Sequence, residues 1–347
     1  MDLKPLTEAV AAGRELAPAD AENVAAALAD PAVPAPAKEE FLEALSRRGE
    51  TPGEIAGLAR AFRKRARDPG LSRWAADAID VCGTGGDRSG TFNISTTVSF
   101  ALAAAGVPVF KHGNRSITSR CGSADLLEAL GIRLDADEAL RVRSMEQLNF
   151  VFLFAPAFHP AFKEIGPVRR SLAARGVRTV FNLLGPLLNP AAPAQQIVGV
   201  FSESVVEPVA RAMHALGLEG GMAVSCVDAE GRRYDELTTV GENQLAGFGR
   251  HRDLQERFHA GDLGFERAPG AQLAGGDLEE NIALLDRVLD GTAPQGLLDT
   301  IVLNAAAALF AAGRAESLRD GLGPARELLL GGAVKAWLHK AREFYRA

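Results

Sequence analysis

A change of pattern near residue 78 constrains the fold of this chain more than any other feature. From there on, short apolar runs of strand-like composition alternate with stretches of helical spacing such as residues 205–217. The strand-like runs cover residues 78–82, 107–110, 149–154, 195–201 and 221–227. Strands that alternate with helices are typical of an α/β domain with a mainly parallel central sheet.

The residues before this point show only helical spacing. Apolar residues recur at helical intervals between residues 3 and 68, and Asp20 is the expected N-cap of one of these helices. We therefore predict an α/β protein in which a small all-helical domain packs on a larger α/β domain, with a cleft between them. The helical domain is expected to cover residues 1–70, joined by part of about 165–190, and the α/β domain residues 71–347.

The composition excludes several classes of function. The chain of 347 residues has 38 Lys and Arg against 44 Asp and Glu, and its net charge of −6 does not favour binding to nucleic acid. The three cysteines, Cys82, Cys121 and Cys226, cannot all form disulfide pairs, and they lack the spacing of metal ligands. We therefore expect a reducing compartment. The N-terminus lacks a signal-peptide pattern, and no apolar run approaches the length of a membrane span. These observations predict a cytoplasmic protein without a membrane partner.

Residues 80–97 are dense in glycine and then in hydroxyl groups. The glycines between residues 83 and 86 follow a predicted strand, and a helix is expected to begin near Ser95 or Thr96. Glycine lets backbone N–H groups approach an anion, and a helix N-terminus adds unpaired N–H donors. The pattern matches neither a P-loop nor a dinucleotide fingerprint, and a plain glycine-rich connection is the alternative. We predict that the loop binds phosphate together with Asn93, Ser95 and Thr96.

Polar side chains also follow the next expected strand. Lys111, His112, Asn114 and Arg115 surround a glycine there. Because ligands collect outside the carboxyl ends of strands in open α/β sheets, we expect these side chains to lie beside the glycine loop. A solvated turn is the alternative. Ser123, a little further along the chain, is expected to cap a helix or to bind a phosphate oxygen, and the two roles are compatible.

Two further stretches carry candidate groups. His159 lies beside a proline, and Arg169 and Arg170 form a pair suited to hold a carboxylate. A structural histidine and a solvated pair of arginines are the alternatives. Asp235 and Glu236 are adjacent and follow the last predicted strand. Adjacent carboxylates suit Mg²⁺, which takes a few carboxylate oxygens together with phosphate and water, although exposed acidic pairs are common.

Taken in order, these motifs resemble the anthranilate phosphoribosyltransferase family, whose members are related to glycosyltransferases and nucleoside phosphorylases. The similar stretches are CGTGGD…FNISTT from residue 82, KHGNR from residue 111, FAPAFHPAF from residue 154, RTVFNLLGPLLNP from residue 178 and DEL from residue 235. The resemblance covers most of the chain. It implies transfer of the 5-phosphoribosyl group from 5-phosphoribosyl 1-diphosphate (PRPP) to anthranilate in tryptophan biosynthesis, with Mg²⁺ as cofactor. It also implies a homodimer that forms through the helical domain.

The resemblance further implies roles for individual residues. It assigns PRPP binding to Gly83, Thr84, Gly85, Gly86, Asp87, Thr91, Asn93, Ser95, Thr96, Lys111 and Ser123. It assigns anthranilate binding to Gly83, His112, Asn114, His159, Arg169, Gly185 and Pro186, and Mg²⁺ binding to Ser95, Asp235 and Glu236. No residue is assigned as a general base, because the arylamine of anthranilate is already neutral at pH 7 and the chain has no Ser-His-Asp or Cys-His constellation.

The chain departs from the family pattern after Arg169, where the stretch to Thr179 is about three residues longer. This insertion beside a predicted acceptor residue keeps a second hypothesis open, namely a related phosphoribosyltransferase with a different aromatic acceptor. A third hypothesis, a non-catalytic relative that binds nucleic acid, predicts a basic cleft and the loss of the acidic pair. The net charge of −6 and the presence of both the glycine loop and the acidic pair argue against it.

Overall fold

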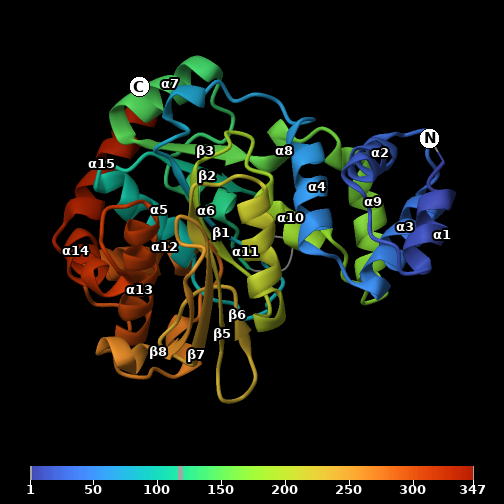
Figure 1. Cartoon of the computed structure of the whole chain (residues 1–347). Helices are drawn as coiled ribbons and strands as arrows, with labels where there is room; N and C mark the ends of the chain where they lie inside the picture. The colour runs from blue at the N-terminus through green and yellow to red at the C-terminus, as the bar shows by residue number, and fades with distance from the viewer. Residues whose placement is uncertain (1, 116–119, 347) are drawn as a thin grey trace.

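A sheet of eight strands forms the centre of the larger lobe in the computed structural model, which describes residues 2–115 and 120–346 (Figure 1). The strands are β1 (Ile79–Gly83), β2 (Val109–Gly113), β3 (Phe150–Phe154), β4 (Gln195–Gly199), β5 (Gly220–Val227), β6 (Arg233–Tyr234), β7 (Glu242–Gly249) and β8 (Gln255–His259). Their order is β3-β2-β1-β4-β5-β7-β8, with β6 paired to β5. The first five strands run parallel, whereas β6, β7 and β8 pair antiparallel. The mainly parallel sheet is therefore as predicted.

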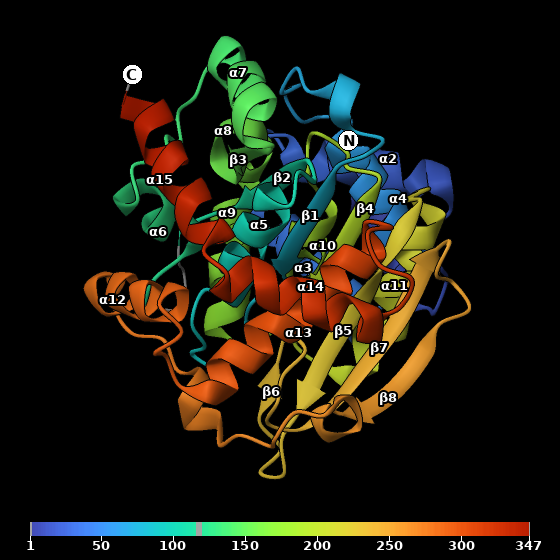
Figure 2. The same ribbon diagram turned by 90° about the vertical axis from the view of Figure 1, so that its left-hand side faces the viewer.

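Helices cover both faces of this sheet. On one face, α5 (Ile94–Ala104) packs against β1, and Figure 2 shows α13 (Gln295–Ala311) and α14 (Leu318–Leu330) lying across the strands. On the other face, α11 (Val206–Ala215) packs against β5 and β7. Because neighbouring strand residues point to opposite sides, Ile197 of β4 joins the core under α5 and α13, and Val198 joins the core that contains α11.

The larger lobe contains several further helices. They are α6 (Ser123–Ala129), α7 (Glu138–Leu148), α8 (Ala155–Phe158), α12 (Leu278–Leu289), α15 (Ala333–Arg346) and the short 3₁₀ helices η1 (Ser72–Trp74), η2 (Glu203–Val205), η3 (Ala260–Leu263) and η4 (Gly270–Leu273). Within residues 2–115 and 120–346, no helix combines the length and the hydropathy that a membrane span requires.

The helical lobe contains α1 (Lys4–Ala11), α2 (Pro18–Ala29), α3 (Ala35–Arg48) and α4 (Pro52–Arg63). It is joined by α9 (Phe162–Ala174), which packs against α2 and α3 although it follows β3 and α8 in the chain (Figure 1). Both α10 (Phe181–Leu187) and α11 pack against α4, so one apolar core runs from the helical lobe to the sheet. These contacts support the domain division that we propose, in which part of 165–190 joins residues 1–70.

The sequence-based expectation was wrong for the N-cap of α2 and did not include strands β7 and β8. Asp20 is not an N-cap, because α2 begins at Pro18 with Ala17 in the cap position. Its carboxylate instead accepts a hydrogen bond from the Ala17 N–H at 3.0 Å, from one turn inside the helix. The antiparallel strands β7 and β8 were not anticipated. β8 is a polar, largely exposed edge strand, and it lacks the apolar run that marks a buried strand.

The order of the strands creates a switch point between β1 and β4. From β1 the chain proceeds to β2 and β3 on one side, and it then returns to β4 on the other side of β1. Gly83 at the end of β1 is in register with Gly199 at the end of β4. In open α/β sheets, ligands bind at such a point, outside the carboxyl ends of the strands. The fold therefore places a candidate site at the loops that follow these two glycines.

Glu54 is a buried carboxylate at the start of α4 that stabilises the helical lobe. It accepts hydrogen bonds from the backbone N–H groups of Leu16 at 2.8 Å and Thr51 at 2.9 Å, and it forms an ion pair with Arg48. We expect Glu54→Gln to lower the free energy of unfolding by about 1 to 3 kcal/mol, because charged hydrogen bonds and an ion pair are lost. Urea unfolding followed by circular dichroism measures the change.

The matched control for this variant is Glu8→Gln on the exposed surface of α1. It should change the free energy of unfolding by less than about 0.5 kcal/mol, because surface substitutions away from special contacts have small effects. A Glu54→Gln effect no larger than that of the control would contradict the prediction.

Candidate active site

A pocket of about 250 Å³ lies at the carboxyl ends of β1 and β2. The predicted PRPP and Mg²⁺ residues that line it are Gly83, Gly85, Gly86, Asp87, Thr91, Asn93, Ser95, Thr96, Lys111, Ser123, Asp235 and Glu236, and the predicted anthranilate residues His112 and Asn114 line it too. Thr84 does not line it, because its Oγ1 accepts a hydrogen bond from the backbone N–H of Phe201 at 3.1 Å. The structure thus brings together groups from widely separated segments of the chain.

The loop after β1 owes its shape to glycine. Gly85 and Gly86 have φ angles of +64° and +77°, a left-handed conformation that residues with a side chain rarely adopt. The backbone N–H of Gly85 donates to Oδ2 of Asp235 at 2.7 Å. At Gly83 the same carboxylate occupies the space that a Cβ would need. The glycines therefore serve both a tight turn and the close approach of an acidic side chain.

Lys111 is buried and points toward the start of α5. Its Nζ donates to the carbonyl of Val81 at 2.9 Å and to Oγ of Ser95 at 3.4 Å. Burial lowers the pKa of Lys111, and the nearby carboxylate of Asp80 opposes that shift. Burial raises the pKa of Asp80 to about 6, against the charge of Lys111 and a hydrogen bond from Asn189 at 2.9 Å. A buried pair of opposite charges thus holds a cationic group at the edge of the pocket.

Three carboxylates converge on another side of the pocket. Burial, and then the charge of Asp87, raises the pKa of Asp235 to about 7. Burial and the charge of Asp235 raise the pKa of Glu236 well above its usual value. In the part of the chain that the structure describes, Oδ2 of Asp87 and Oε2 of Glu236 are buried without a hydrogen-bond partner. Carboxylate oxygens in this setting suit a hard divalent cation.

These carboxylates do not form a complete metal site by themselves. No group of three or more His, Cys, Asp or Glu side chains is arranged to hold a metal ion within the described ranges 2–115 and 120–346. A cation such as Mg²⁺ usually binds through one or two carboxylates and takes its other ligands from water and substrate phosphate. The arrangement therefore fits a cation that binds together with a phosphorylated ligand.

Two imidazoles lie beside the pocket. The centroids of the His112 and His159 rings are 5.2 Å apart. Burial lowers the pKa of His112 to about 3 and that of His159 to about 4, so both rings are uncharged at neutral pH. They hydrogen-bond with the backbone of Gly185 and Leu188 respectively. Each ring keeps a buried Nε2 that has no hydrogen-bond partner among the described residues, and each Nε2 is available to a polar ligand.

Aromatic contacts link these histidines to Arg169. The rings of His159, Phe162 and Phe181 follow one another at centroid distances of 5.7 and 5.5 Å. The guanidinium carbon of Arg169 lies 5.6 Å from the centre of the Phe181 ring. Burial lowers the pKa of Arg169, and no carboxylate in the described chain offsets that shift. Arg169 and His159 do not line the pocket at the ends of β1 and β2, and neither do Gly185 and Pro186 of α10.

The sequence matches the glycosyl transferase family a/b domain over residues 75–335 and the helical bundle domain of the same family over residues 4–66. The anthranilate phosphoribosyltransferase of Symbiobacterium thermophilum is 42% identical over 344 residues, which cover 99% of this chain and 97% of the relative. That of Roseiflexus sp. (strain RS-1) is 45% identical over 304 residues, which cover 86% and 85%. The crystal structure of anthranilate phosphoribosyltransferase (TrpD) from Thermus thermophilus is 42% identical, has a TM-score of 0.88 and is matched over 100% of both chains. The chain belongs to the anthranilate phosphoribosyltransferase family.

A more distant anthranilate phosphoribosyltransferase shares the fold. The structure from Saccharomyces cerevisiae in complex with PRPP and Mg is 24% identical, has a TM-score of 0.81 and is matched over 95% of this chain and 94% of that chain. A helical lobe on a larger α/β lobe with a mostly parallel sheet is therefore the architecture of this chain and of its relatives. The predicted fold class is confirmed.

Two residues around the site of this family member escaped the sequence interpretation. Asp80 lies within an apolar strand and is buried. Because a buried carboxylate needs a charged or hydrogen-bonding partner, an aspartate in this apolar run could have been recognised from the sequence as a candidate site residue. Asn281 of α12 donates from Nδ2 to Oδ1 of Asn93 at 3.1 Å and orients that amide. No local pattern marks Asn281, because the two residues are 188 positions apart.

Of the two roles predicted for Ser123, helix capping is wrong. Gly122 occupies the N-cap of α6, and Ser123 is the first residue of the helix. Its Oγ donates to the carbonyl of Asn114 at 3.4 Å, and the residue lines the pocket. The hydroxyl therefore connects the loop after β2 with the start of α6.

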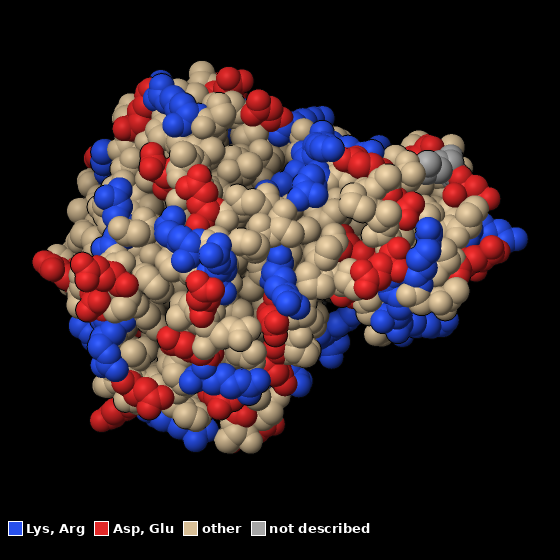
Figure 3. Space-filling model, viewed as in Figure 1, with Lys and Arg blue, Asp and Glu red and all other residues tan. Residues whose placement is uncertain are grey.

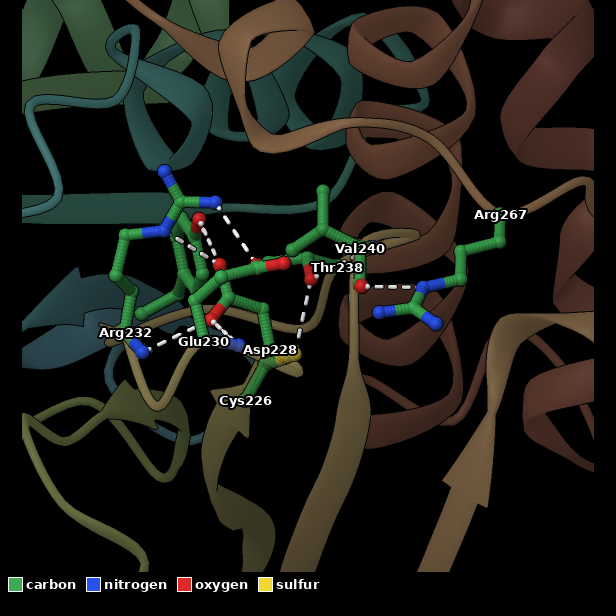
Figure 4. A network of polar contacts seen from close by, with 8 residues as sticks. Cys226, Asp228, Glu230, Arg232, Thr238, Val240 and Arg267 are labelled. Atoms are coloured by element: carbon green, nitrogen blue, oxygen red, sulfur yellow. Dashed lines mark hydrogen bonds and ion pairs between the residues drawn. The ribbon is translucent and has the colours of Figure 1, made fainter.

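The polar network in Figure 4 holds the turn that leads to the acidic pair. Asp228 accepts a hydrogen bond from the backbone N–H of Arg232 at 2.8 Å and one from its Nε at 2.7 Å. Thr238, two residues after the acidic pair, donates to Sγ of Cys226 at 3.0 Å. The acidic pair lies between these two anchors. A local hairpin therefore carries both carboxylates to the end of β1.

The buried acidic pair lowers the stability of the free protein. The pKa of Asp235 in the folded chain, about 7, lies above its ordinary value of 3.8, so between these pH values the folded state keeps a proton that the unfolded state releases. The stability that this proton confers is lost as the pH rises through 7. We expect Asp235→Asn to raise the free energy of unfolding by about 1 to 3 kcal/mol at pH 8, and by less at pH 5. Urea unfolding without Mg²⁺ measures the difference.

Asp228→Asn is the matched control, because the sign of its effect should be opposite. Although burial opposes the shift, hydrogen bonds from Arg232 lower the pKa of Asp228. Its charge therefore stabilises the folded state above the pKa of the unfolded chain, and that stability is lost as the pH falls. This variant should be less stable than the parent at pH 8. Destabilisation by both substitutions at pH 8 would contradict the prediction.

Proposed function

We propose that the chain transfers the 5-phosphoribosyl group of PRPP to the amine of anthranilate, which yields N-(5-phosphoribosyl)anthranilate and diphosphate for tryptophan biosynthesis. One observation carries this proposal: the glycine loop, Lys111 and the acidic pair, which are distant in the sequence, meet in one pocket. The chain also belongs, over nearly its whole length, to a family whose members are named for this reaction.

In this proposal PRPP binds in the pocket at the end of β1. The backbone N–H groups of Gly86 and Asp87, which have no acceptor among the described residues, face its phosphates. The N-terminus of α5 adds donors and a favourable dipole. The side chains that contact PRPP are those of Thr91, Asn93, Ser95, Thr96, Lys111 and Ser123, which line the pocket. Lys111 supplies the positive charge, since it is fixed by Val81 and Ser95.

Mg²⁺ fits the acidic side of the pocket. Asp87 and Glu236 have buried oxygens without a hydrogen-bond partner among the described residues, and burial together with the charge of Asp87 raises the pKa of Asp235. A divalent cation offsets the cost of charged carboxylates in this setting. Asp235 and Glu236, with Oγ of Ser95, would hold the ion together with phosphate oxygens of PRPP. When bound, it supplies positive charge to the departing diphosphate.

Anthranilate approaches along the wall beside this pocket. The residues of that wall are His112, Asn114, His159, Arg169, Gly185 and Pro186. Arg169 suits the carboxylate of anthranilate, because a guanidinium binds a carboxylate through two parallel hydrogen bonds and no protein carboxylate among the described residues competes for it. The two imidazoles are uncharged and offer Nε2 to the amine side of the acceptor.

The residues of the site act by position and by charge. Cleavage of the C1–O bond leaves positive charge on the ribose and negative charge on diphosphate. Lys111 and the N–H groups of the loop stabilise the negative charge, which is electrostatic catalysis by groups already in place. The arylamine has a free lone pair at neutral pH, so the site needs no strong base. Alignment of the two substrates supplies the remaining rate enhancement.

We extend the proposal to assembly and location. A homodimer that forms through the helical lobe and a cytoplasmic location both accord with the family resemblance. Cys82, Cys121 and Cys226 form no disulfide bond in the described chain, which also accords with a reducing compartment. Size-exclusion chromatography with light scattering tests the dimer directly.

Neither alternative function gains support from the structure. The extra residues after Arg169 extend the end of α9, where Arg175 pairs with Glu39 and Glu43 of α3 at 3.1 and 3.2 Å. The extra residues thus contact the helical lobe and not His159. No observation therefore favours a different acceptor. On the face drawn in Figure 3, Lys and Arg alternate with Asp and Glu, a pattern that does not favour nucleic acid as the ligand.

The reaction itself is tested by the loss of anthranilate fluorescence in the presence of the chain, PRPP and Mg²⁺. We expect turnover that ceases when EDTA removes the metal and returns when Mg²⁺ is added in excess. Mass spectrometry of the product identifies N-(5-phosphoribosyl)anthranilate. An absence of turnover at saturating substrates would overturn the proposal, and PRPP binding without anthranilate turnover would support a different acceptor.

Arg169→Ala should weaken the use of anthranilate much more than that of PRPP. Loss of a charged hydrogen-bonding pair corresponds to a rise in the anthranilate KM of about tenfold or more, with the PRPP KM within about twofold. Steady-state kinetics with each substrate varied in turn measures both values. Arg170→Ala is the control, because Arg170 is its exposed neighbour on the same helix. An anthranilate KM equal to that of the control would refute the role of Arg169.

A further inference from the structure

The loop after β1 separates two hollows. On one side lies the PRPP pocket described above, and on the other lies a hollow of about 680 Å³. Asp87 and Ser89 line both. The residues of the second hollow that matter here are Arg88, Arg178, Phe201, Arg233 and Tyr234. This position makes the second hollow a place from which a side chain can control the loop without touching PRPP.

Arg178 reaches the loop through this second hollow. Its Nη2 donates to the carbonyl oxygen of Gly86 at 3.0 Å, and its guanidinium carbon lies 4.2 Å from the centre of the Phe201 ring. The backbone N–H of Phe201 donates in turn to Oγ1 of Thr84 at the start of the loop. The aromatic ring therefore supports the guanidinium while the guanidinium holds the loop.

The loop backbone has little other support near Gly86. Gly85, Gly86 and Arg88 all have positive φ angles, of +64°, +77° and +61°. Among the described residues, the backbone of residues 86–89 makes a single hydrogen bond, which is the one from Arg178 to the carbonyl of Gly86. A backbone of this kind can present either face of a peptide unit to the pocket. The contact with Arg178 therefore selects one of them.

The selected face follows from peptide geometry. In a planar trans peptide the C=O and the next N–H point in opposite directions, and the described chain has no cis peptide. Arg178 draws the carbonyl of Gly86 toward the second hollow. The N–H of Asp87 is consequently turned the other way, toward the PRPP pocket. An N–H group that is already oriented toward a phosphate is an electrostatic contact that needs no rearrangement on binding.

The helical lobe fixes the backbone on which Arg178 stands. Oγ of Ser46 in α3 donates to the carbonyl of Arg178 at 2.6 Å. Three residues earlier, Arg175 forms ion pairs with Glu39 and Glu43 of the same helix. Arg178 thus extends from a segment that is anchored on the helical lobe to a loop that belongs to the α/β lobe.

We propose that Arg178 is a positioning residue for the glycine loop after β1. From its anchor on the helical lobe, Arg178 holds the Gly86–Asp87 peptide so that the N–H of Asp87 faces PRPP. The inference rests on the proposed function, because it assumes that PRPP is the ligand of the pocket. Arg178 lines the second hollow and does not line the PRPP pocket. Its loss should therefore affect the donor selectively and leave the acceptor wall intact.

The test compares Arg178→Ala with Arg233→Ala. Arg233 lines the same hollow and carries the same charge, but it pairs with Glu203 and donates no hydrogen bond to the loop within the described residues. Isothermal titration of PRPP with Mg²⁺ into each variant, without anthranilate, measures the donor affinity. We expect Arg178→Ala to weaken PRPP binding and to raise the PRPP KM by about fivefold to tenfold, with Arg233→Ala and all anthranilate KM values within about twofold of the parent.

Two further variants separate the geometric role from charge and from folding. Arg178→Lys keeps the charge but lacks the planar group that lies on the Phe201 ring, so it should recover less than half of the lost affinity. Ser46→Ala leaves the guanidinium intact but loosens its anchor, and it should weaken PRPP binding in the same direction. Thermal unfolding confirms that each variant is folded.

The outcomes are distinct. Equal weakening in Arg178→Ala and Arg233→Ala, or full recovery in Arg178→Lys, would overturn the inference, because charge alone would then explain the effect. An Arg178→Ala variant that binds PRPP as the parent does would overturn it as well. If the parent binds PRPP but does not consume anthranilate, the proposed reaction fails while the titrations still decide the role of Arg178.

Discussion

The close approach of Asp235 to the ends of two strands is the constraint on which the site depends. Its carboxylate lies against Gly83 and its backbone lies against Gly199, and a Cβ at either glycine would overlap with it. These glycines are register partners of β1 and β4, at the switch point of the sheet. A loop from the antiparallel edge can therefore fill the gap between two parallel strands, and the glycine loop, the acidic pair and Lys111 meet around it.

This arrangement concentrates charge that the folded protein only partly neutralises. Burial raises the pKa of Asp80 and Asp235 and lowers that of Lys111. Shifts of this kind in a pocket are typical of functional sites, because the groups are arranged for a ligand and not for the stability of the free chain. An anionic donor that binds with a cation satisfies both kinds of group at once. Ligand binding should therefore stabilise this protein markedly.

Much of the site was predictable because its chemistry is local. The glycines at 85 and 86 are required by the left-handed backbone, and the acidic pair follows a strand that the apolar pattern marks. Thr84 shows where this reasoning ends, since it belongs to the same loop but turns its hydroxyl to the backbone of Phe201. A motif identifies the groups that a loop offers. It does not say which way each of them points, because neighbouring segments compete for the same hydrogen bonds.

The sequence by itself determined the alternation of strands and helices, the turn at the glycine loop and the kinds of charged group in the site, because these depend on backbone preference and on near neighbours. Only the tertiary structure decided the contacts between distant segments. Asp235 reaches Gly85 across 150 positions, and Arg178 reaches Gly86 across 92. Such partners are chosen by the order of the strands and the packing of the helices, which bring separate loops to one edge of the sheet, and no local pattern records that choice.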